Sequence, residues 1–168
     1  TMDEAYKVQK GWVSRKISNG QKVIGLDIFI PKDLRERIMS HKKLSDRIEL
    51  IEGDSTSEKT IEKVKSILNG SKKVLVILDS YHTHQHVLNE LKTFSQFVGK
   101  GNYLICGDTI VEDIPTQTHR PRPWGPGNNP GTAVREFLTE NDCFQVDEDL
   151  EKKLLITCHP GGYLQAVK

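Results

Sequence analysis

The stretch VLVILDSYHTHQHVLNEL, residues 74–91, decides the fold class of this chain. It begins as an apolar run typical of a buried strand, and its character changes at Asp79. After His82 the apolar residues recur at helical spacing, which predicts a helix that packs on the sheet. A strand that passes through a polar joint into a helix is the repeating unit of a parallel α/β sheet.

Similar apolar runs recur on both sides of this stretch, with helical patterns between them. Strands are predicted within KVIGLDIFI (22–30), RIELIEGD (47–54), KKVLVILDS (72–80) and GNYLICGDT (101–109), and a late strand with a Gly-Gly corner within KKLLITCHPGGYLQAV (152–167). Helices are predicted in the segments 31–43, 55–70, 82–98 and 129–142. The sequence therefore predicts an α/β fold, a parallel sheet with helices on both faces.

Length and charge favour one domain with small partners. At 168 residues the chain fits a single domain over 1–168. Its 24 Lys and Arg are interleaved with 23 Asp and Glu, for a net charge of +1, so we expect neither a nucleic acid nor an anionic membrane as partner. A small-molecule or sugar acceptor is the expected partner, and a homo-oligomer stays open.

Cysteine usage predicts the compartment. The three cysteines are odd in number and have no C-x-x-C spacing, which favours a reducing setting. No apolar run approaches the roughly 18 residues of a membrane span, and the first residues lack the features of a signal peptide. We therefore expect a cytoplasmic protein.

The composition changes in IPTQTHRPRPWGPGNNPG, residues 114–131. Five prolines and three glycines exclude a helix or a central strand there, so we expect an ordered loop or lid. Prolines restrict its backbone, and Trp124 adds a large aromatic side chain beside Arg122. We expect this lid to fold over the site and to contact the substrate through these two residues.

Each of the four clear strands has an aspartate at or near its carboxyl end. These residues are Asp27, Asp54, Asp79 and Asp108. Ligands of open α/β sheets bind outside the carboxyl ends of the strands, and a row of acids there favours a cation or sugar hydroxyls. Asp27 stands where an acid accepts hydrogen bonds from a ribose, and Asp79 and Asp108 could supply hard oxygen ligands to one Mg²⁺-type ion. Each aspartate alone also fits a helix cap or loop.

Three histidines follow Asp79 at intervals of two. His82 and His86 would share one helix face if the helix began near His82, whereas His84 would point elsewhere. A zinc site would then combine Asp79, His82 and His86. Alternatively, the histidines cap the helix, or His82 is an acid/base or orients the substrate beside a metal. The sequence favours either of these alternatives over zinc.

Several stretches together resemble the cephalosporin hydroxylase family, whose members look like S-adenosylmethionine-dependent methyltransferases, including sugar O-methyltransferases. They are QKVIGLDIFIP, DRIELIEGDST, VLVILDSYHTHQHVLNEL, GNYLICGDTIVEDIP, RPRPWGPGNNPGTAVREFL and LLITCHPGGYLQAV, within residues 21–168. The resemblance implies a Rossmann-like class I methyltransferase fold, with S-adenosylmethionine and Mg²⁺ or a similar divalent ion as cofactors.

The resemblance also implies roles for individual residues. Asp27 would contact the cofactor ribose, Asp54 and Ser55 would lie near the adenine, and Asp79 with Asp108 would hold the metal that orients a substrate hydroxyl. His82 is then our candidate for the catalytic base or an orienting residue, beside Asp79.

The chain departs from the family pattern in two places. Where members often have an acidic pair after the fifth strand, this chain has Gly107 before Asp108, and Glu112 and Asp113, which follow Asp108 by four and five residues, could substitute for the missing acid. Residues 1–20 match poorly and contain neither an apolar first strand nor a glycine-rich loop.

The missing first strand would leave a gap in the sheet between the strands that end at Asp27 and Asp79. We expect either a segment absent near residues 9–17 or a rearranged sheet in which these two strands pair directly. A third alternative is that KGWVSRKI (10–17) serves as a polar strand.

These observations are compatible with three alternative functions. The first is a metal-assisted O-methyltransferase that acts on a hydroxyl of a sugar or small natural product. The second is a non-catalytic or cofactor-deficient domain of the same fold. The third, which the sequence favours least, is an iron-dependent hydroxylase with Asp79, His82 and His86 on the iron.

Overall fold

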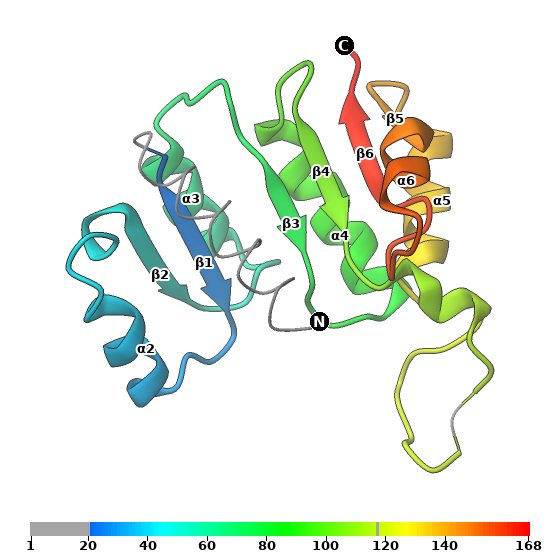
Figure 1. Cartoon of the computed structure of the whole chain (residues 1–168), viewed down its shortest axis with the longest axis horizontal. Helices are drawn as coiled ribbons and strands as arrows, with labels where there is room; N and C mark the ends of the chain where they lie inside the picture. Colours follow the sequence, from blue (N-terminus) through cyan, green and yellow to red (C-terminus); the bar gives the residue numbers. More distant parts are fainter. Residues whose placement is uncertain (1–20, 117) are drawn as a thin grey trace. The chain divides into compact units, whose positions relative to one another are not determined.

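The computed structural model describes residues 21–116 and 118–168, which Figure 1 colours along the chain. These residues divide into two compact units, one up to Val64 and one from Lys65 to Lys168.

The first unit contains a two-stranded parallel sheet. Its elements are β1 (Val23–Asp27), α2 (Lys32–Met39), the 3-10 helix η1 (Ser45–Arg47), β2 (Ile48–Glu52) and the first turns of α3 (Glu58–Leu68). The register places Val23 opposite Ile48 and Asp27 opposite Glu52. Parallel neighbours need a crossover connection, and α2 lies within it. Both strands therefore end at the same edge, as predicted.

The second unit contains a four-stranded mixed sheet. Its elements are β3 (Val76–Leu78), α4 (His84–Phe94), η2 (Ser95–Phe97), β4 (Tyr103–Cys106), η3 (Thr109–Asp113), α5 (Pro130–Glu140), β5 (Phe144–Val146), α6 (Glu148–Leu154) and β6 (Tyr163–Ala166). The strand order is β3-β4-β6-β5. β3 and β4 are parallel, whereas β6 is antiparallel to both β4 and β5.

The core of the second unit lies between its sheet and two helices. α4 and α5 pack on each other, and α4 lies behind β3 and β4 in Figure 1. The buried side chains of these elements include Val87, Leu88, Leu91, Phe94, Ala133, Val134, Phe137, Leu104 and Leu164. The predicted helical spacing after His82 is confirmed, since Val87, Leu91 and Phe94 recur on the buried face of α4.

The α/β class is confirmed, but two details of the prediction are wrong. The sheet is not purely parallel, because β6 enters it between β4 and β5 in the opposite direction. The late strand is also shorter than expected. Leu155 and Ile156, which looked like its start, are 89% and 91% exposed and follow α6. Asp147 begins that helix by accepting a hydrogen bond from the N–H of Leu150.

The strands that end at Asp27 and Asp79 belong to separate sheets. Within residues 21–116 and 118–168 no ladder joins β1 to β3, so the direct pairing of a rearranged sheet is not found there. Residues 9–17, where a missing segment or a polar strand was expected, lie outside the described residues.

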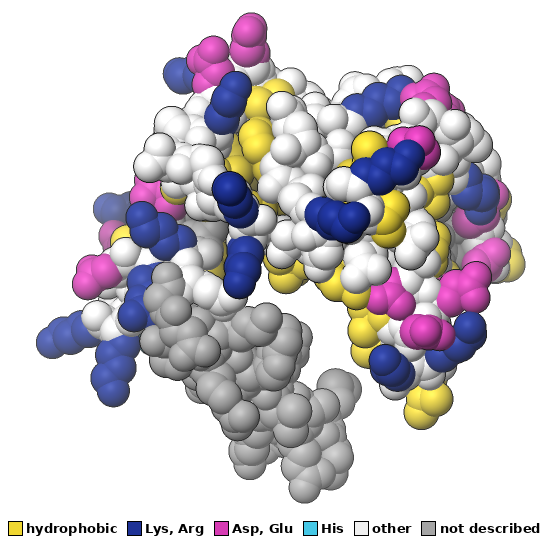
Figure 2. All heavy atoms as spheres, turned by 90° about the horizontal axis from the view of Figure 1, so that it is seen from above, with side chains coloured by type: hydrophobic (Ala, Val, Ile, Leu, Met, Phe, Trp, Pro, Cys, Tyr) yellow, Lys and Arg dark blue, Asp and Glu magenta, His cyan; other side chains and the backbone are white. Residues whose placement is uncertain are grey.

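The surface shows the mixture of charges expected from the sequence. Basic and acidic side chains are both spread over the face drawn in Figure 2. None of the helices in the described part of the chain combines the length and hydropathy that a membrane span requires.

Candidate functional site

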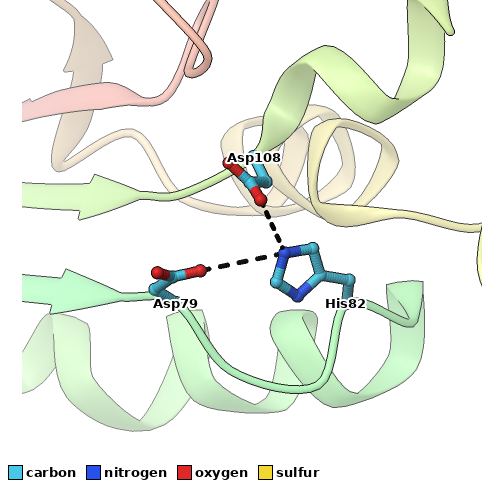
Figure 3. Close-up of side chains that lie close together, drawn as sticks. All are labelled: Asp79, His82 and Asp108. Carbon is cyan, nitrogen blue, oxygen red and sulfur yellow. Dashed lines mark hydrogen bonds and ion pairs between the residues drawn. The ribbon is translucent and has the colours of Figure 1, made fainter.

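Three polar side chains meet at the carboxyl ends of β3 and β4 (Figure 3). Asp79 follows the last residue of β3, and Asp108 lies two residues beyond β4. His82 comes from the loop that leads into α4. Because β3 and β4 are parallel neighbours, their carboxyl ends are adjacent, which brings residues 26 or more positions apart into one cluster.

The ligand atoms of the three side chains lie close together. His82 Nε2 lies 3.0 Å from Asp108 Oδ2 and 3.8 Å from Asp79 Oδ1. One ligand atom from each residue lies within 4.8 Å of the other two. The His82 side chain is 15% exposed, whereas those of Asp79 and Asp108 are 69% and 44% exposed, so the cluster is open to a ligand on its acidic side.

A hydrogen bond at Nδ1 fixes the orientation of the His82 ring. Its Nδ1 lies 2.5 Å from the carbonyl oxygen of Ser80, which can only accept, so Nδ1 donates. The hydroxyl of Ser80 in turn donates to Glu90 Oε2 at 2.5 Å, and Glu90 is 2% exposed. His82 Nε2 therefore faces the two aspartates.

This donor set fits a divalent cation. An imidazole electron pair and two carboxylates repel each other unless a proton or a cation lies among them. Carboxylate oxygens suit Mg²⁺, imidazole nitrogen suits several transition ions, and a ligating histidine usually donates its second N–H to a carbonyl, as His82 does. Two carboxylate ligands would leave positions for water or a substrate oxygen, and the His82 imidazole would lie beside them as a proton acceptor.

The other two histidines do not join the cluster, so the grouping of Asp79, His82 and His86, which the zinc and iron alternatives required and the sequence favoured least, is not found among the described residues. α4 begins only at His84, which puts His82 before the first helical turn. His86 Nε2 lies 3.4 Å from Glu90 Oε1 on the next turn of the helix. His84 bonds Thr132 at 2.8 Å and Glu136 at 3.1 Å, both on α5.

Comparison with known proteins places the chain in a family. A family model described as Rhamnosyl O-methyltransferase/CmcI matches residues 8–167. This chain belongs to that family. The match confirms the resemblance to the cephalosporin hydroxylase family.

Members of the Rhamnosyl O-methyltransferase/CmcI family from mycobacteria are among the similar proteins. Rhamnosyl O-methyltransferases of Mycobacterium bovis (strain BCG) and Mycobacterium tuberculosis (strain H37Rv) are each 33% identical over 134 residues, which are 74% of this chain. The chain spans about half the length of these relatives, 52%. A solved structure, the MycE methyltransferase from the mycinamycin biosynthetic pathway in complex with Mg and SAH, matches with a TM-score of 0.39 and 23% identity, over 56% of this chain and 21% of that one.

Gly107 occupies a position in this family member where no side chain fits. A Cβ atom there would lie 2.9 Å from the carbonyl oxygen of Leu78 and 3.4 Å from Asp79 Oδ1. The Gly107 N–H donates to the same Leu78 oxygen at 2.7 Å, so the backbones of the two loops are in direct contact. An acidic residue at position 107 would have to push the loops apart.

Glu112, the predicted substitute for that acid, has a different role. Its carboxylate accepts hydrogen bonds from the Gly127 N–H at 2.8 Å, from the Asn129 side chain, and from Arg135 at 2.7 Å. The bond from Gly127 and then that from Asn129 lower the pKa of Glu112. The carboxylate therefore anchors the end of the lid instead of joining the cluster. Its contribution to the stability of the folded protein is complete above the ordinary carboxyl pKa and is lost as the pH falls through the lowered value.

The lid brings Trp124 against the cluster. The Trp124 ring lies 5.2 Å from the His82 ring at an interplanar angle of 30°, and 5.5 Å from the Tyr81 ring in an edge contact. Arg122 lies 5.1 Å above the Trp124 ring. Asn128 joins the lid to α4 by accepting from the His84 N–H at 2.9 Å. The predicted proximity of Trp124 and Arg122 to the site is thus seen in the geometry, whereas their contact with a substrate stays a prediction.

The residues predicted to contact the nucleoside lie in the first unit. Asp27 ends β1, and its Oδ1 accepts from the Phe29 N–H at 3.1 Å. Asp54 Oδ1 accepts from the N–H and the hydroxyl of Thr56 at 2.8 and 2.7 Å, which forms a turn before α3. Ser55 lies within that turn. These bonds give both aspartates a structural role, and their contact with a cofactor stays a prediction.

Cys106 is predicted to resist alkylation in the folded protein. Burial raises the pKa of its thiol to about 12, with further contributions from the charges of Glu90, Asp79 and Asp108. The thiolate fraction at pH 8 is then about 10⁻⁴. Cys143 and Cys158 are exposed, so iodoacetamide should label both of them quickly and Cys106 only after unfolding. Equal labelling of all three cysteines in the native protein, measured by peptide mass spectrometry, would contradict this.

The structure also reveals partners that the sequence did not predict. Tyr81 contacts Trp124, Glu90 supports the Ser80 hydroxyl, and His159 bonds the backbone of Asp108. The pairs Glu90–Ser80 and His159–Asp108 are 10 and 51 residues apart, so no local pattern marks them.

Proposed function

We propose that this protein is an O-methyltransferase that transfers the methyl group of S-adenosylmethionine to a hydroxyl of a sugar, assisted by a divalent ion. Family membership and the relatives named rhamnosyl O-methyltransferase support the reaction and the sugar acceptor. The observation that carries the proposal is the cluster of Asp79, His82 and Asp108 at the ends of two parallel strands, where α/β sheets bind ligands.

Asp79 and Asp108 are the residues proposed to hold the ion. Both carboxylates point toward the same space, and both are accessible. A divalent ion bound there would make a substrate hydroxyl more acidic and hold its oxygen in place.

His82 is proposed as the base. Its Nδ1 proton is held by the Ser80 carbonyl, so Nε2 can accept the proton of the substrate hydroxyl. The hydroxyl oxygen forms a bond to the methyl carbon as the carbon–sulfur bond breaks, and the electron pair of that bond stays on sulfur. The products are the methyl ether and S-adenosylhomocysteine, with the proton on His82. Beyond this proton transfer, the protein contributes mainly by placing the two reactants in line.

The binding residues follow the same proposal. Asp27 would accept hydrogen bonds from the ribose hydroxyls of the cofactor, and Asp54 with Ser55 would lie near its adenine. Trp124 and Arg122 would contact the acceptor, because both lie on the lid segment that reaches His82.

The proposal is tested by incubating the purified protein with labelled S-adenosylmethionine and a panel of rhamnose-containing and other sugar acceptors. Methyl transfer that needs a divalent ion and stops with a chelator is the expected result. Calorimetric titration with S-adenosylmethionine separates this function from a cofactor-deficient domain, which would release no heat of binding at any metal concentration.

Replacement of Trp124 by alanine is predicted to affect the acceptor more than the cofactor. An aromatic contact beyond simple burial contributes about 0.5–1.5 kcal/mol, so the KM for the acceptor should rise roughly 2- to 12-fold. The dissociation constant of S-adenosylmethionine should change less. Trp124→Phe, which keeps an aromatic ring, is the matched control. Equal losses for both ligands, together with a lower melting temperature, would instead show that Trp124 only stabilises the loop.

The cytoplasmic setting and a homo-oligomer belong to the same proposal. The described cysteines, Cys106, Cys143 and Cys158, are all free thiols, which is compatible with a reducing compartment. Light scattering of the purified protein would establish the oligomeric state.

A further inference from the structure

His159 lies against the backbone of Asp108 and outside the three-residue cluster. Its Nδ1 accepts a hydrogen bond from the Asp108 N–H at 2.8 Å and lies 3.8 Å from Asp108 Oδ1. Because Nδ1 accepts, the ring carries its proton on Nε2. The ring is thus hydrogen-bonded to the backbone of Asp108 and not to its carboxylate.

The bond from the Asp108 N–H holds an unusual backbone conformation in place. Its φ of 49° and ψ of 32° are left-handed, a region that few residues other than glycine adopt, with Asn and Asp the commonest exceptions. This conformation makes the turn from β4 into η3 and sets the direction of the Asp108 Cα–Cβ bond. The direction of that bond brings Asp108 Oδ2 to 3.0 Å from His82 Nε2. A relaxed backbone at this residue would move the carboxylate away from the cluster.

The segment that contains His159 is itself tied to η3. The Thr109 hydroxyl donates to the carbonyl oxygen of Pro160 at 2.8 Å, and the Ile110 N–H donates to that of Cys158 at 3.2 Å. Thr109 is 3% exposed, so its bond is shielded from water. The carbonyls on both sides of His159 are therefore held in place, which limits the positions available to its ring.

A close backbone approach fixes the other end of the segment. The Cys106 N–H donates to the carbonyl oxygen of Gly162 at 2.8 Å, and the Gly162 N–H donates to that of His159 at 2.9 Å. A Cβ atom at Gly162 would lie 2.3 Å from the Cys106 carbonyl oxygen, so only glycine allows this approach. The strand that leads to Asp108 and the loop that supports it are thus joined directly.

We propose that His159 is a positioning residue that holds Asp108 in its left-handed conformation and thereby aims the Asp108 carboxylate at the metal. This role rests on the proposed function, because it presupposes that Asp108 is a ligand. His159 acts through Asp108 and not by contact with the acceptor. Its contribution should therefore appear in metal affinity before any catalytic step.

Binding of Mn²⁺ alone, followed by the electron paramagnetic resonance signal of the free ion, tests this role. His159→Ala removes the acceptor, and His159→Gln moves it to about the distance of Nε2. His159→Asn keeps an oxygen near the position of Nδ1. Loss of a supporting partner typically weakens metal binding about 10- to 100-fold, so the alanine and glutamine variants should bind Mn²⁺ that much more weakly. The asparagine variant should bind within about 3-fold of the wild type.

A double-mutant cycle separates positioning from general stability. Asn tolerates the left-handed region, so Asp108→Asn should keep the turn but lose the charged ligand. In that background His159→Ala should cause no further loss of Mn²⁺ affinity, since the residue through which it acts is already gone. His41→Ala, at an exposed histidine of the first unit, controls for the loss of an imidazole.

The possible failures are distinguishable. Wild-type protein that binds no Mn²⁺ would overturn the metal role of the cluster and this role with it. Wild-type affinity in both His159→Ala and His159→Gln would overturn only the role of His159. Equal weakening in the asparagine, glutamine and alanine variants would overturn it as well, because the position of the acceptor would then not matter.

Discussion

Replacement of Asp79 by asparagine is expected to abolish metal-dependent methyl transfer and to leave the fold intact. The substitution removes a charged ligand oxygen, while the amide has nearly the same size. The Asp79 side chain is 69% exposed and lies near Asp108, so loss of its charge relieves repulsion and opens no cavity. Turnover with saturating metal and the melting temperature measured on the same preparation would check both parts.

The matched control is Asp149→Asn, since Asp149 is 85% exposed on α6 and lies outside the cluster. It should have wild-type turnover. Wild-type activity that persists undiminished after exhaustive chelation would exclude the metal role altogether. Activity that is lost in Asp79→Asn together with the folded state would show only that the residue is structural.

Replacement of His82 by alanine should lower the turnover rate roughly 10²- to 10⁴-fold, the range typical of a lost acid or base. Nε2 is the only nitrogen of this ring that faces the two aspartates, because Nδ1 is occupied by the Ser80 carbonyl. Binding of S-adenosylmethionine should change little, so the loss should appear in kcat. Single-turnover kinetics with a saturating acceptor would isolate that step from product release.

His84→Ala is the control for His82→Ala. His84 lies two residues away and bonds α5 through Thr132 and Glu136, so its removal should affect stability more than the rate of transfer. A rate in His82→Ala within about 3-fold of the wild type would exclude the base role. An equal loss of rate in both variants would point instead to general disorder of the loop before α4.

The meeting of Asp79 with Asp108 could be predicted because it depends on local pattern and one rule of topology. Each follows an apolar run, and carboxyl ends of neighbouring parallel strands share an edge. The order of the remaining strands followed no such rule. β6 joins the sheet antiparallel to both of its neighbours, and the apolar Leu155 and Ile156 suggested a strand where the structure has an exposed turn after α6.

The sequence could not show which histidines lie beside Asp79, because that depends on the residue at which α4 begins. A helix that began at His82 would have placed His82 and His86 on one face, whereas the helix begins at His84. Such a shift of two residues is within the uncertainty of any helix boundary. That shift decides whether Asp79 and His82 are joined by a second imidazole, that of His86, or by a second carboxylate, that of Asp108.

The sequence by itself determined the α/β class, the family and the two acids at the ends of β3 and β4, since these depend on periodicity and on motifs within short segments. The tertiary structure alone decided the partners of those acids. The bond from Asp108 to His159 and the contact of Trp124 with His82 join residues 51 and 42 positions apart (124 − 82 = 42). Such pairs form only when the loops after different strands are brought to one edge of the sheet, and side-chain packing and backbone geometry there are not encoded in any local pattern.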